Sequence, residues 1–300
     1  MLFGFLNCDK PPGMTSRDLV NIVQRRLHTG ISKGEGKLKV GHCGTLDPLA
    51  TGVMVIAVGS AVRLTPYMLK HSKRYIGQFR LAASSETGDL EMGFKDHPEL
   101  PKLNRDQVQQ ACEKLTGEIQ QVPPAYSAIW VDGQRAYDRV RRGESVEIPT
   151  RTVQIHDLRL TEFDYPSMTL DIVCGSGTYI RTLGDDVAKA AGSLAVMTDL
   201  RRIGVGDFRI DQAITIDELR NAPLEPYLLP GIHAVTHLEK RVVNRNEVDK
   251  ICNGICIPPS SDAQMDCAAE VAAVTESGEL IAILRSKPRG LCPYRVFPPS

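Results

Sequence analysis

Three observations predict an α+β fold for this chain of 300 residues. Residues 53–58 form a continuous apolar run rich in β-branched side chains, which is typical of a strand buried on both faces. Residues 75–81 alternate between side-chain types in the way that a half-buried strand does. Residues 104–115 are expected to form a helix, with Asn104 as its cap and Gly117 as its stop signal.

The elements before residue 81 are expected to begin with a short strand over residues 2–6. A turn in KPPGMTS then lets Thr15 or Ser16 cap a helix over residues 18–27. A short helix at 62–69 follows the buried strand.

The elements after residue 81 begin with an acidic segment, 84–99, that we expect to be an exposed loop. Residues 122–144 predict a proline-broken loop, a strand that turns at Asp132-Gly133, and a basic helix that ends near Gly143. The elements that follow are strands over 151–163 and 168–174, a helix over 182–191 and further strands within 200–210.

A domain boundary is expected near residue 232. Residues 221–231 hold three prolines, as the end of a first domain often does. Beyond them, residues 271–274 and 280–284 predict a hairpin around Ser277-Gly278 in a small β-rich tail. The predicted division is therefore residues 1–232 and residues 233–300.

The composition, 42% hydrophobic and 24% charged, is that of a globular chain. The longest apolar run is far shorter than the roughly 20 residues that a bilayer span needs, and the N-terminus lacks the features of a signal peptide. We therefore expect a cytoplasmic protein without a membrane segment. The eight cysteines show no Cys-x-x-Cys pair and no zinc spacing, so we expect reduced thiols and no bound metal.

The formal net charge of zero argues against a nucleic-acid partner, but the charges are distributed unevenly. Three stretches are basic. Such runs are usually solvated surface, so alone they only permit binding to RNA. Their members are Arg25, Arg26, Lys33, Lys37 and Lys39; Arg63, Lys70, Lys73, Arg74 and Arg80; and Arg135, Arg139, Arg141 and Arg142.

The first candidate for chemistry is Asp47, in VGHCGTLDPLATGVMVIAVG at residues 40–59. An isolated Asp before a Pro is usually a turn residue. Here, however, His42 lies in the same loop, and the glycines around it, among them Gly44, permit close approach of the backbone to a ligand. His42 and Asp47 could therefore converge on one ligand.

The second candidate is a cation for that carboxylate. A carboxylate that acts as a nucleophile must stay ionised in a pocket that excludes water, which favours a fixed cation nearby. In CGSGTYIRTLGDDVA, Thr182 and Asp185 match a capping box, which would leave residues 177–181 extended. Tyr179 and Arg181 would then share one face, a flat ring for a base and a forked cation for a carboxylate.

Six segments together resemble the TruB family, the bacterial tRNA pseudouridine-55 synthases. They are KPPGMTS, KVGHCGTLDPLATGVMVIAVG, KRY, VPPAYSA, GSGTYIRTLGDDVA and LRRIGVGDF, and they span about residues 1–231. The resemblance implies a pseudouridine synthase fold, with a mixed, mainly antiparallel central sheet and flanking helices. It also implies that residues 233–300 are a PUA-like RNA-binding domain, although the motifs there are weak. Cys43 stands where many relatives have Thr or another small residue.

The resemblance also implies roles for individual residues. Asp47 matches the catalytic aspartate, and Arg181 matches the arginine that pairs with it. The other matches are a stacking tyrosine at Tyr75, a second active-site tyrosine at Tyr179, an apolar wall at Leu200, a space-filling histidine at His42, and the supporting residues Lys10, Pro11, Gly44 and Leu46.

The implied reaction exchanges a C–N glycosidic bond for a C–C bond within one uridine, so no cofactor, metal or protein partner is expected. The substrate would be the T arm of tRNA, with its target base flipped out. Basic residues at 63–80, 135–142 and 201–202 are expected to grip its phosphates, and the protein is expected to be a monomer. Asp47 could attack the sugar C1′, attack the uracil C6, or abstract the C2′ proton. Tyr179 is a candidate for removing the C5 proton.

Two alternatives remain beside the stand-alone enzyme. The catalytic subunit of a guide-RNA-directed pseudouridine synthase has the same core motifs but needs a guide and protein partners. A tRNA-folding chaperone would bind the same RNA without chemistry.

Overall fold

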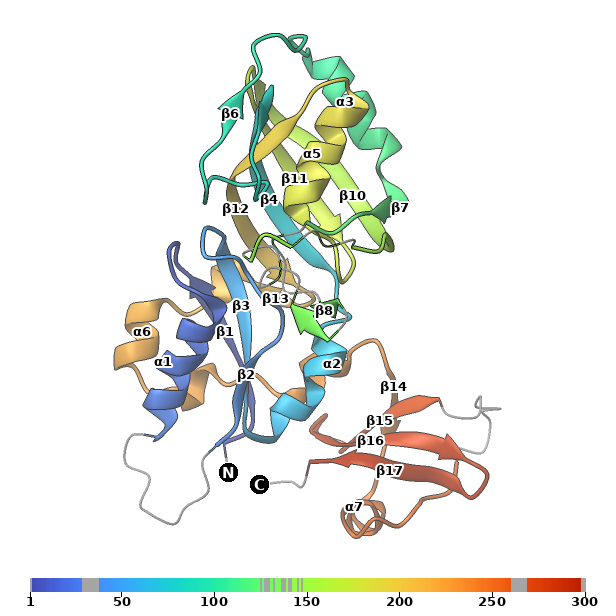
Figure 1. Cartoon of the computed structure of the whole chain (residues 1–300). Helices are drawn as coiled ribbons and strands as arrows, with labels where there is room; N and C mark the ends of the chain where they lie inside the picture. Colours follow the sequence, from blue (N-terminus) through green and yellow to red (C-terminus); the bar gives the residue numbers. More distant parts are fainter. Residues whose placement is uncertain are drawn as a thin grey trace.

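The computed structural model describes residues 2–28, 38–124, 126, 130–131, 133–135, 139, 142–144, 146, 148–259 and 269–297. Figure 1 shows a long central sheet with helices beside it, and a second, smaller sheet formed by the C-terminal part of the chain. Within the described residues, no helix is long and apolar enough to span a bilayer. The α+β fold is confirmed.

Within the described ranges, the central sheet has nine strands. Seven lie in the order β1 (Gly4–Lys10), β3 (Thr51–Val58), β12 (Ala195–Val205), β4 (Lys73–Leu81), β11 (Ser167–Cys174), β10 (Arg151–Asp164) and β7 (Gly117–Gln121). β2 (Val40–His42) pairs with β3, and β13 (Phe208–Arg209) pairs with β12. The β3–β12 pair is parallel and the other pairs described in this sheet are antiparallel, so the predicted mixed, mainly antiparallel sheet is confirmed.

Burial follows the two strand patterns that the sequence shows. Seven of the eight residues of β3 are buried, because this strand lies between β1 and β12 with cover on both faces. In β4 the odd-numbered positions are buried and the residues between them are more exposed. Tyr75 therefore points to a buried side of the sheet.

Helices cover the sheet in two groups (Figure 1). α3 (Arg105–Lys114) and α5 (Ile180–Ala190) pack against each other and against strands of the upper half. α1 (Ser16–His28) and α6 (Ile216–Asn221) pack beside β1 and β2. The predicted cap at Asn104 is confirmed, since its side chain accepts a hydrogen bond from the Gln107 amide.

The short elements connect these layers. α2 spans Thr65–Met68, and the 3-10 helices span Gly59–Leu64, Ile210–Gln212, Glu225–Tyr227 and Gly231–Val235. Two-residue strands form the ladders β5 (Ala83–Ser84) with β6 (Lys95–Asp96) and β8 (Trp130–Val131) with β9 (Gln134–Arg135). The predicted basic helix that ends near Gly143 lies largely outside the described residues.

The C-terminal sheet has the order β14 (Glu239–Val242), β15 (Glu270–Val274), β16 (Leu280–Lys287) and β17 (Gly290–Val296), with α7 (Arg245–Cys252) packed against β17. β15 and β16 form the predicted hairpin. One apolar cluster contains Phe5 and Val55 of the central sheet together with Ile283 and Phe297. The two sheets therefore share part of their core.

Two sequence-based expectations are wrong in this architecture. Helix α5 begins at Ile180, with Tyr179 as its cap residue, and Gly177 lies in a turn with a φ of +88°. The predicted extended segment 177–181 is therefore absent, and Tyr179 and Arg181 do not share one face of a strand because Arg181 lies in the first helical turn. Cys256 and Cys292 form a disulfide, although all eight cysteines were expected to be reduced. The two cysteines meet because Ile257 pairs with Leu291, which brings the segment after α7 onto β17.

Candidate active site

The loop that carries Asp47 is held from several sides. Ser16, at the start of α1, donates from Oγ to the Leu46 carbonyl and accepts from the Leu46 amide, both at 2.9 Å. Lys10 Nζ donates to the Pro48 carbonyl at 3.2 Å, and the Gly13 amide donates to the same oxygen at 2.9 Å. The loop is thus fixed on both sides of Asp47 while the aspartate side chain stays 38% exposed.

Two glycines allow this loop to lie against β12. Gly52 has a φ of +99°, and a Cβ there would lie 2.2 Å from the Arg202 carbonyl oxygen. Gly44 has a φ of +123°, and its carbonyl accepts from the Arg202 side chain at 3.2 Å. The predicted close approach of backbone at these glycines is made to the protein's own strand.

Asp47 and Arg181 form an ion pair. Arg181 Nε lies 3.1 Å from Asp47 Oδ2, and the arginine side chain is only 7% exposed. The same guanidinium lies 3.3 Å from Oδ2 of Asp89, which is 2% exposed, and it donates to the Thr87 carbonyl at 2.5 Å. Arg181 therefore joins the exposed Asp47 to a buried carboxylate.

Tyr75 and Leu200 lie on neighbouring strands close to this pair. Tyr75 of β4 pairs with Arg202 of β12, and Gly77 pairs with Leu200, so these side chains share one face of the sheet. Burial raises the pKa of the Tyr75 hydroxyl, the charge on Arg202 opposes that rise, and Asp47 adds to it. Tyr75 is thus close to both charged groups.

His42 lies at the end of β2, half-buried. Burial lowers the pKa of its imidazole, and the positive charges of Arg17 and Arg202 lower it further, which favours the neutral ring. Its Nδ1 is buried and has no hydrogen-bond partner among the described residues. A ring that favours the neutral form and leaves Nδ1 unpartnered suits a role in filling space or contacting a base.

Tyr179 is held by side chains from other strands. The Gln121 side chain hydrogen-bonds to both backbone groups of Tyr179. Its Oε1 accepts from the Tyr179 amide at 2.8 Å, and its Nε2 donates to the Tyr179 carbonyl at 3.2 Å. The Arg151 guanidinium lies 4.5 Å from the centre of the Tyr179 ring. The structure therefore places Tyr179 two residues before Arg181, as the cap residue of α5, and gives its ring a cation neighbour from β10.

Lys10 ends β1 and is fully buried. Burial lowers the pKa of Lys10 to about 8. The negative charge of Asp47 opposes this shift, and the positive charge of Arg202 increases it. Lys10 also donates to the carbonyl of Pro11, at 3.0 Å. Both supporting residues therefore adjoin the Asp47 loop.

Sequence reasoning missed Asp89 and gave Arg202 the wrong environment. The segment 84–99 was expected to be an exposed loop, but Thr87 and Asp89 are buried against Arg181. Arg202 was expected to grip RNA phosphates, but it is 1% exposed. The dipeptide Gly88-Asp89 is typical of a turn, whereas nothing in the local sequence indicates that Asp89 is buried.

Several other basic residues expected to grip phosphates are engaged within the protein. Lys73 is buried and donates to the carbonyls of Leu69 and His71. The ion-paired residues are Arg74 with Asp171, Arg80 with Asp96, Arg139 and Arg142 with Glu144, and Arg201 with Asp9.

No cluster of three or more metal-ligating side chains occurs in the part of the chain that the structure describes. The candidate site consists of carboxylates, cations and a buried tyrosine. It places a partly exposed carboxylate, paired with a buried guanidinium, close to a buried aromatic ring.

The fold is similar to that of a chain in a solved structure titled "Crystal Structure of a Cbf5-Nop10-Gar1 Complex". The TM-score is 0.73 and the identity 25%, over 98% of this chain and 84% of that one. A curated relative from Rhodopirellula baltica, named tRNA pseudouridine synthase B, is 41% identical over 98% of this chain and 94% of its own length. A relative of the same name from Moorella thermoacetica is 36% identical over 99% of this chain and 100% of its own length.

Two family models match in tandem. The N-terminal domain of TruB family pseudouridylate synthases matches residues 32–180, and the tRNA pseudouridylate synthase B C-terminal domain matches residues 181–230. The predicted class is confirmed: the molecule has the pseudouridine synthase fold and is an isomerase. The chain belongs to the TruB family.

Proposed function

We propose that this protein converts uridine to pseudouridine at position 55 in the T loop of tRNA, in the cytoplasm, as a monomer without a guide RNA or protein partner. The observation that carries the proposal is the ion pair between Asp47 and Arg181, next to Tyr75 and Leu200. Relatives named tRNA pseudouridine synthase B match almost the whole chain, which supports isomerisation of a tRNA uridine.

The target base must leave the folded T loop before it reaches Asp47. Extrusion of a stacked base costs about a few kcal/mol, which contacts to the rest of the RNA have to supply. In the proposed complex the uracil stacks on Tyr75 against Leu200, and His42 fills the space beside the nucleotide. Asp47 stays partly exposed and is therefore accessible to the sugar or the base.

Asp47 starts the cleavage of the bond between the sugar C1′ and the uracil N1. The uracil then turns between Tyr75 and Leu200 and rejoins C1′ through its C5. The C5 proton leaves last, and Tyr179 is the candidate base for it. Arg181 holds the carboxylate in place as charge moves during these steps.

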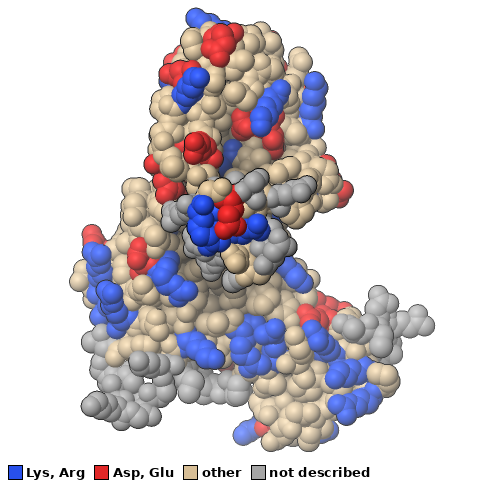
Figure 2. All heavy atoms as spheres, in the orientation of Figure 1, with Lys and Arg blue, Asp and Glu red and all other residues tan. Residues whose placement is uncertain are grey.

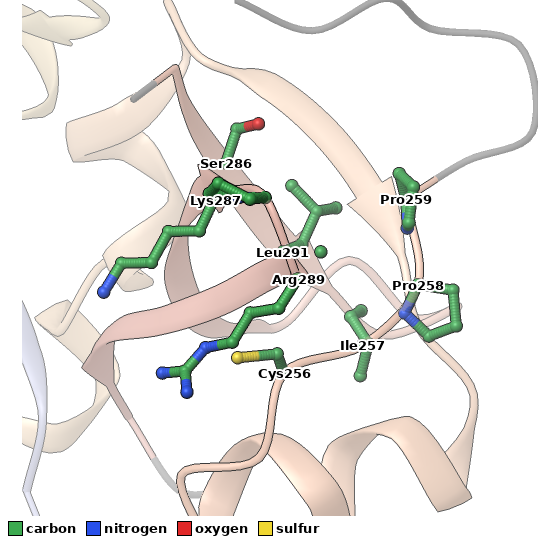
Figure 3. A pocket seen from close by; sticks show the side chains of 10 residues that line it. Cys256, Ile257, Pro258, Pro259, Ser286, Lys287, Arg289 and Leu291 are labelled. Carbon is green, nitrogen blue, oxygen red and sulfur yellow. The ribbon is translucent and has the colours of Figure 1, made fainter. Parts of the chain in front are cut away.

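We also propose that residues 233–300 form a PUA-like RNA-binding domain. Figure 2 shows Lys and Arg side chains gathered on and beside the C-terminal sheet. A surface pocket of about 600 Å³ there is lined by Lys287, Arg289, Pro258 and Pro259 among others, with both cations on the side away from the prolines (Figure 3). Such a surface suits an RNA backbone, since phosphates bind cations and exposed apolar faces accept bases.

The test is to incubate the purified full chain with an unmodified tRNA transcript, without other RNA or protein, and to map pseudouridine at nucleotide resolution. We expect modification at position 55 alone, and none in a transcript with cytidine at that position. Modification at another uridine would contradict the assigned site. Product that appears only after a guide RNA and partner proteins are added would favour the guide-directed alternative.

A further inference from the structure

Arg202 is the most deeply buried arginine near the candidate site and carries a charge that the proposed mechanism does not use. Its side chain is 1% exposed, and no carboxylate forms an ion pair with it within the described ranges. Burying a cation is costly unless hydrogen bonds compensate for the lost water. Its position therefore calls for an explanation beyond packing.

The Arg202 side chain hydrogen-bonds to Tyr75 and donates to backbone carbonyls on the two sides of Asp47. Nε donates to Val53 at 2.7 Å, where β3 begins after the loop. The two terminal nitrogens donate to Gly44 at 3.2 Å and to Thr45 at 3.5 Å, before Asp47. One planar guanidinium thus connects the strand after the loop to the segment that precedes the aspartate.

The backbone of Arg202 makes the same connection. Arg202 pairs with Gly52 in the parallel β3–β12 ladder, and the Gly52 Cα lies so close that no side chain fits there. In the antiparallel ladder on the other side, Arg202 pairs with Tyr75. Arg202 therefore contacts both the loop that carries Asp47 and the tyrosine on which we propose that uracil stacks.

We propose that Arg202 is a positioning residue that fixes the Asp47 loop relative to Tyr75, so that the carboxylate meets the sugar in a reactive geometry. The inference rests on the proposed function, since it concerns the rate of that reaction. Displacing reacting groups by about 1 Å is able to slow a reaction on the order of 100-fold. Removing the guanidinium should therefore slow the chemical step more than it weakens binding to tRNA.

The test compares Arg202→Lys and Arg202→Met with Arg201→Lys as a matched control. Arg201 is the adjacent arginine on β12, but it pairs with Asp9 and its side chain is 40% exposed. For each variant we would measure the single-turnover rate at saturating enzyme, the tRNA dissociation constant, and the folded fraction by thermal unfolding. A role confined to stability would lower the folded fraction and leave the rate per folded molecule unchanged.

We expect Arg202→Met to lower the rate per folded molecule about 100-fold, with the dissociation constant within about threefold of the wild type. Arg202→Lys keeps the charge without the fork, so it should lie between Arg202→Met and the wild type. Arg201→Lys should keep the wild-type rate. If Arg202→Met does not fold, the rate per folded molecule of Arg202→Lys alone tests the positioning role.

A folded Arg202→Lys with the wild-type rate per molecule would overturn the inference. So would an equal loss in Arg201→Lys. The wild type run in parallel separates the two claims: absence of pseudouridine there would refute the proposed function, whereas an active wild type beside an equally active Arg202 variant refutes only the role of Arg202.

Discussion

Arg181 is shared by two carboxylates that differ in exposure. The Asp47 side chain is 38% exposed and the Asp89 side chain 2%. The buried Asp89 and the Thr87 carbonyl hold the guanidinium from behind, so that Nε faces Asp47. A planar fork with several donors is able to make all of these contacts at once, and an ammonium group is not.

Arg181→Lys should therefore lower the single-turnover rate about 100-fold or more, in the range found when one preorganised donor is removed from an active site. Quench-flow measurement of pseudouridine in tRNA checks this. A variant with near-normal kinetics would show that the ion pair is not needed. Lys189→Arg, at the far end of the same helix, is the control and should react at the wild-type rate.

Lys10 gives the reaction an expected pH dependence. Burial lowers its pKa to about 8, so the ammonium is charged below that pH and loses its proton above it. Deprotonation removes positive charge beside Asp47 and weakens the hydrogen bond to the Pro48 carbonyl. The single-turnover rate should fall as the pH rises through about 8.

A loss of folding stability caused by deprotonation of Lys10 does not explain such a fall in rate. Between about pH 8 and the ordinary lysine pKa of 10.5, Lys10 binds a proton in the unfolded chain but not in the folded one, so this group makes folding more favourable as the pH rises.

The Lys10→Met variant should have a lower single-turnover rate and should lack the fall in rate near pH 8. Lys73→Met is the control, because Lys73 has the same lowered pKa of about 8 without a contribution from Asp47. A fall that persists in Lys10→Met would refute the assignment.

At the scale of elements, helix α5 places Arg181 by lying directly on strand β4. A Cβ at Gly184 would lie 2.0 Å from the ring of Phe79, so only glycine permits this approach. Gly184→Ala should cost about 1–3 kcal/mol of unfolding free energy, as overpacking of a core does. It should also lower activity, because the displaced helix carries Arg181. Urea unfolding and single-turnover assays check both effects.

The matched control is Gly204→Ala. A Cβ there meets its nearest atom at 3.6 Å, which is ordinary contact, so its stability should stay within about 0.5 kcal/mol of the wild type. Equal stability in both variants would contradict the account of how α5 is seated.

Elements with a local signal could be predicted from the sequence, and those set by distant contacts could not. The cap at Asn104 and the alternation in β4 depend on neighbouring residues, and both are present. The start of α5 is different, because Gln121 of a distant strand holds the peptide of Tyr179 and replaces a local cap. The burial of Asp89 likewise depends on Arg181, which no local pattern reveals.

At the scale of the whole molecule, the C-terminal sheet is joined to the central one through a shared apolar cluster. Phe297 is 2% exposed, and its ring stacks on Phe3 with centroids 5.3 Å apart. Phe297→Ala should lower the unfolding free energy by about 3–5 kcal/mol, as the loss of a buried aromatic ring does. Tyr294 is 40% exposed, with the Arg285 and Arg295 guanidinium groups over its ring, so Tyr294→Ala should cost only about 1 kcal/mol. Denaturant unfolding distinguishes them, and equal effects would contradict the shared core.

The class of the protein, a pseudouridine synthase, could be predicted because six separate segments resemble the motifs of that family. The Cys256–Cys292 disulfide could not, since the two residues lie 36 positions apart and spacing alone does not pair them. The ion pair between Asp47 and Arg181 was expected from the resemblance, although the local structure expected around Arg181 was wrong.

The most direct test of the account is the turnover of Asp47→Asn on unmodified tRNA, measured together with its dissociation constant. The amide keeps the shape of the side chain and removes its charge. We predict no detectable pseudouridine and a dissociation constant within about threefold of the wild type. Appreciable product from this variant would contradict the central claim that a charged oxygen at position 47 starts the reaction.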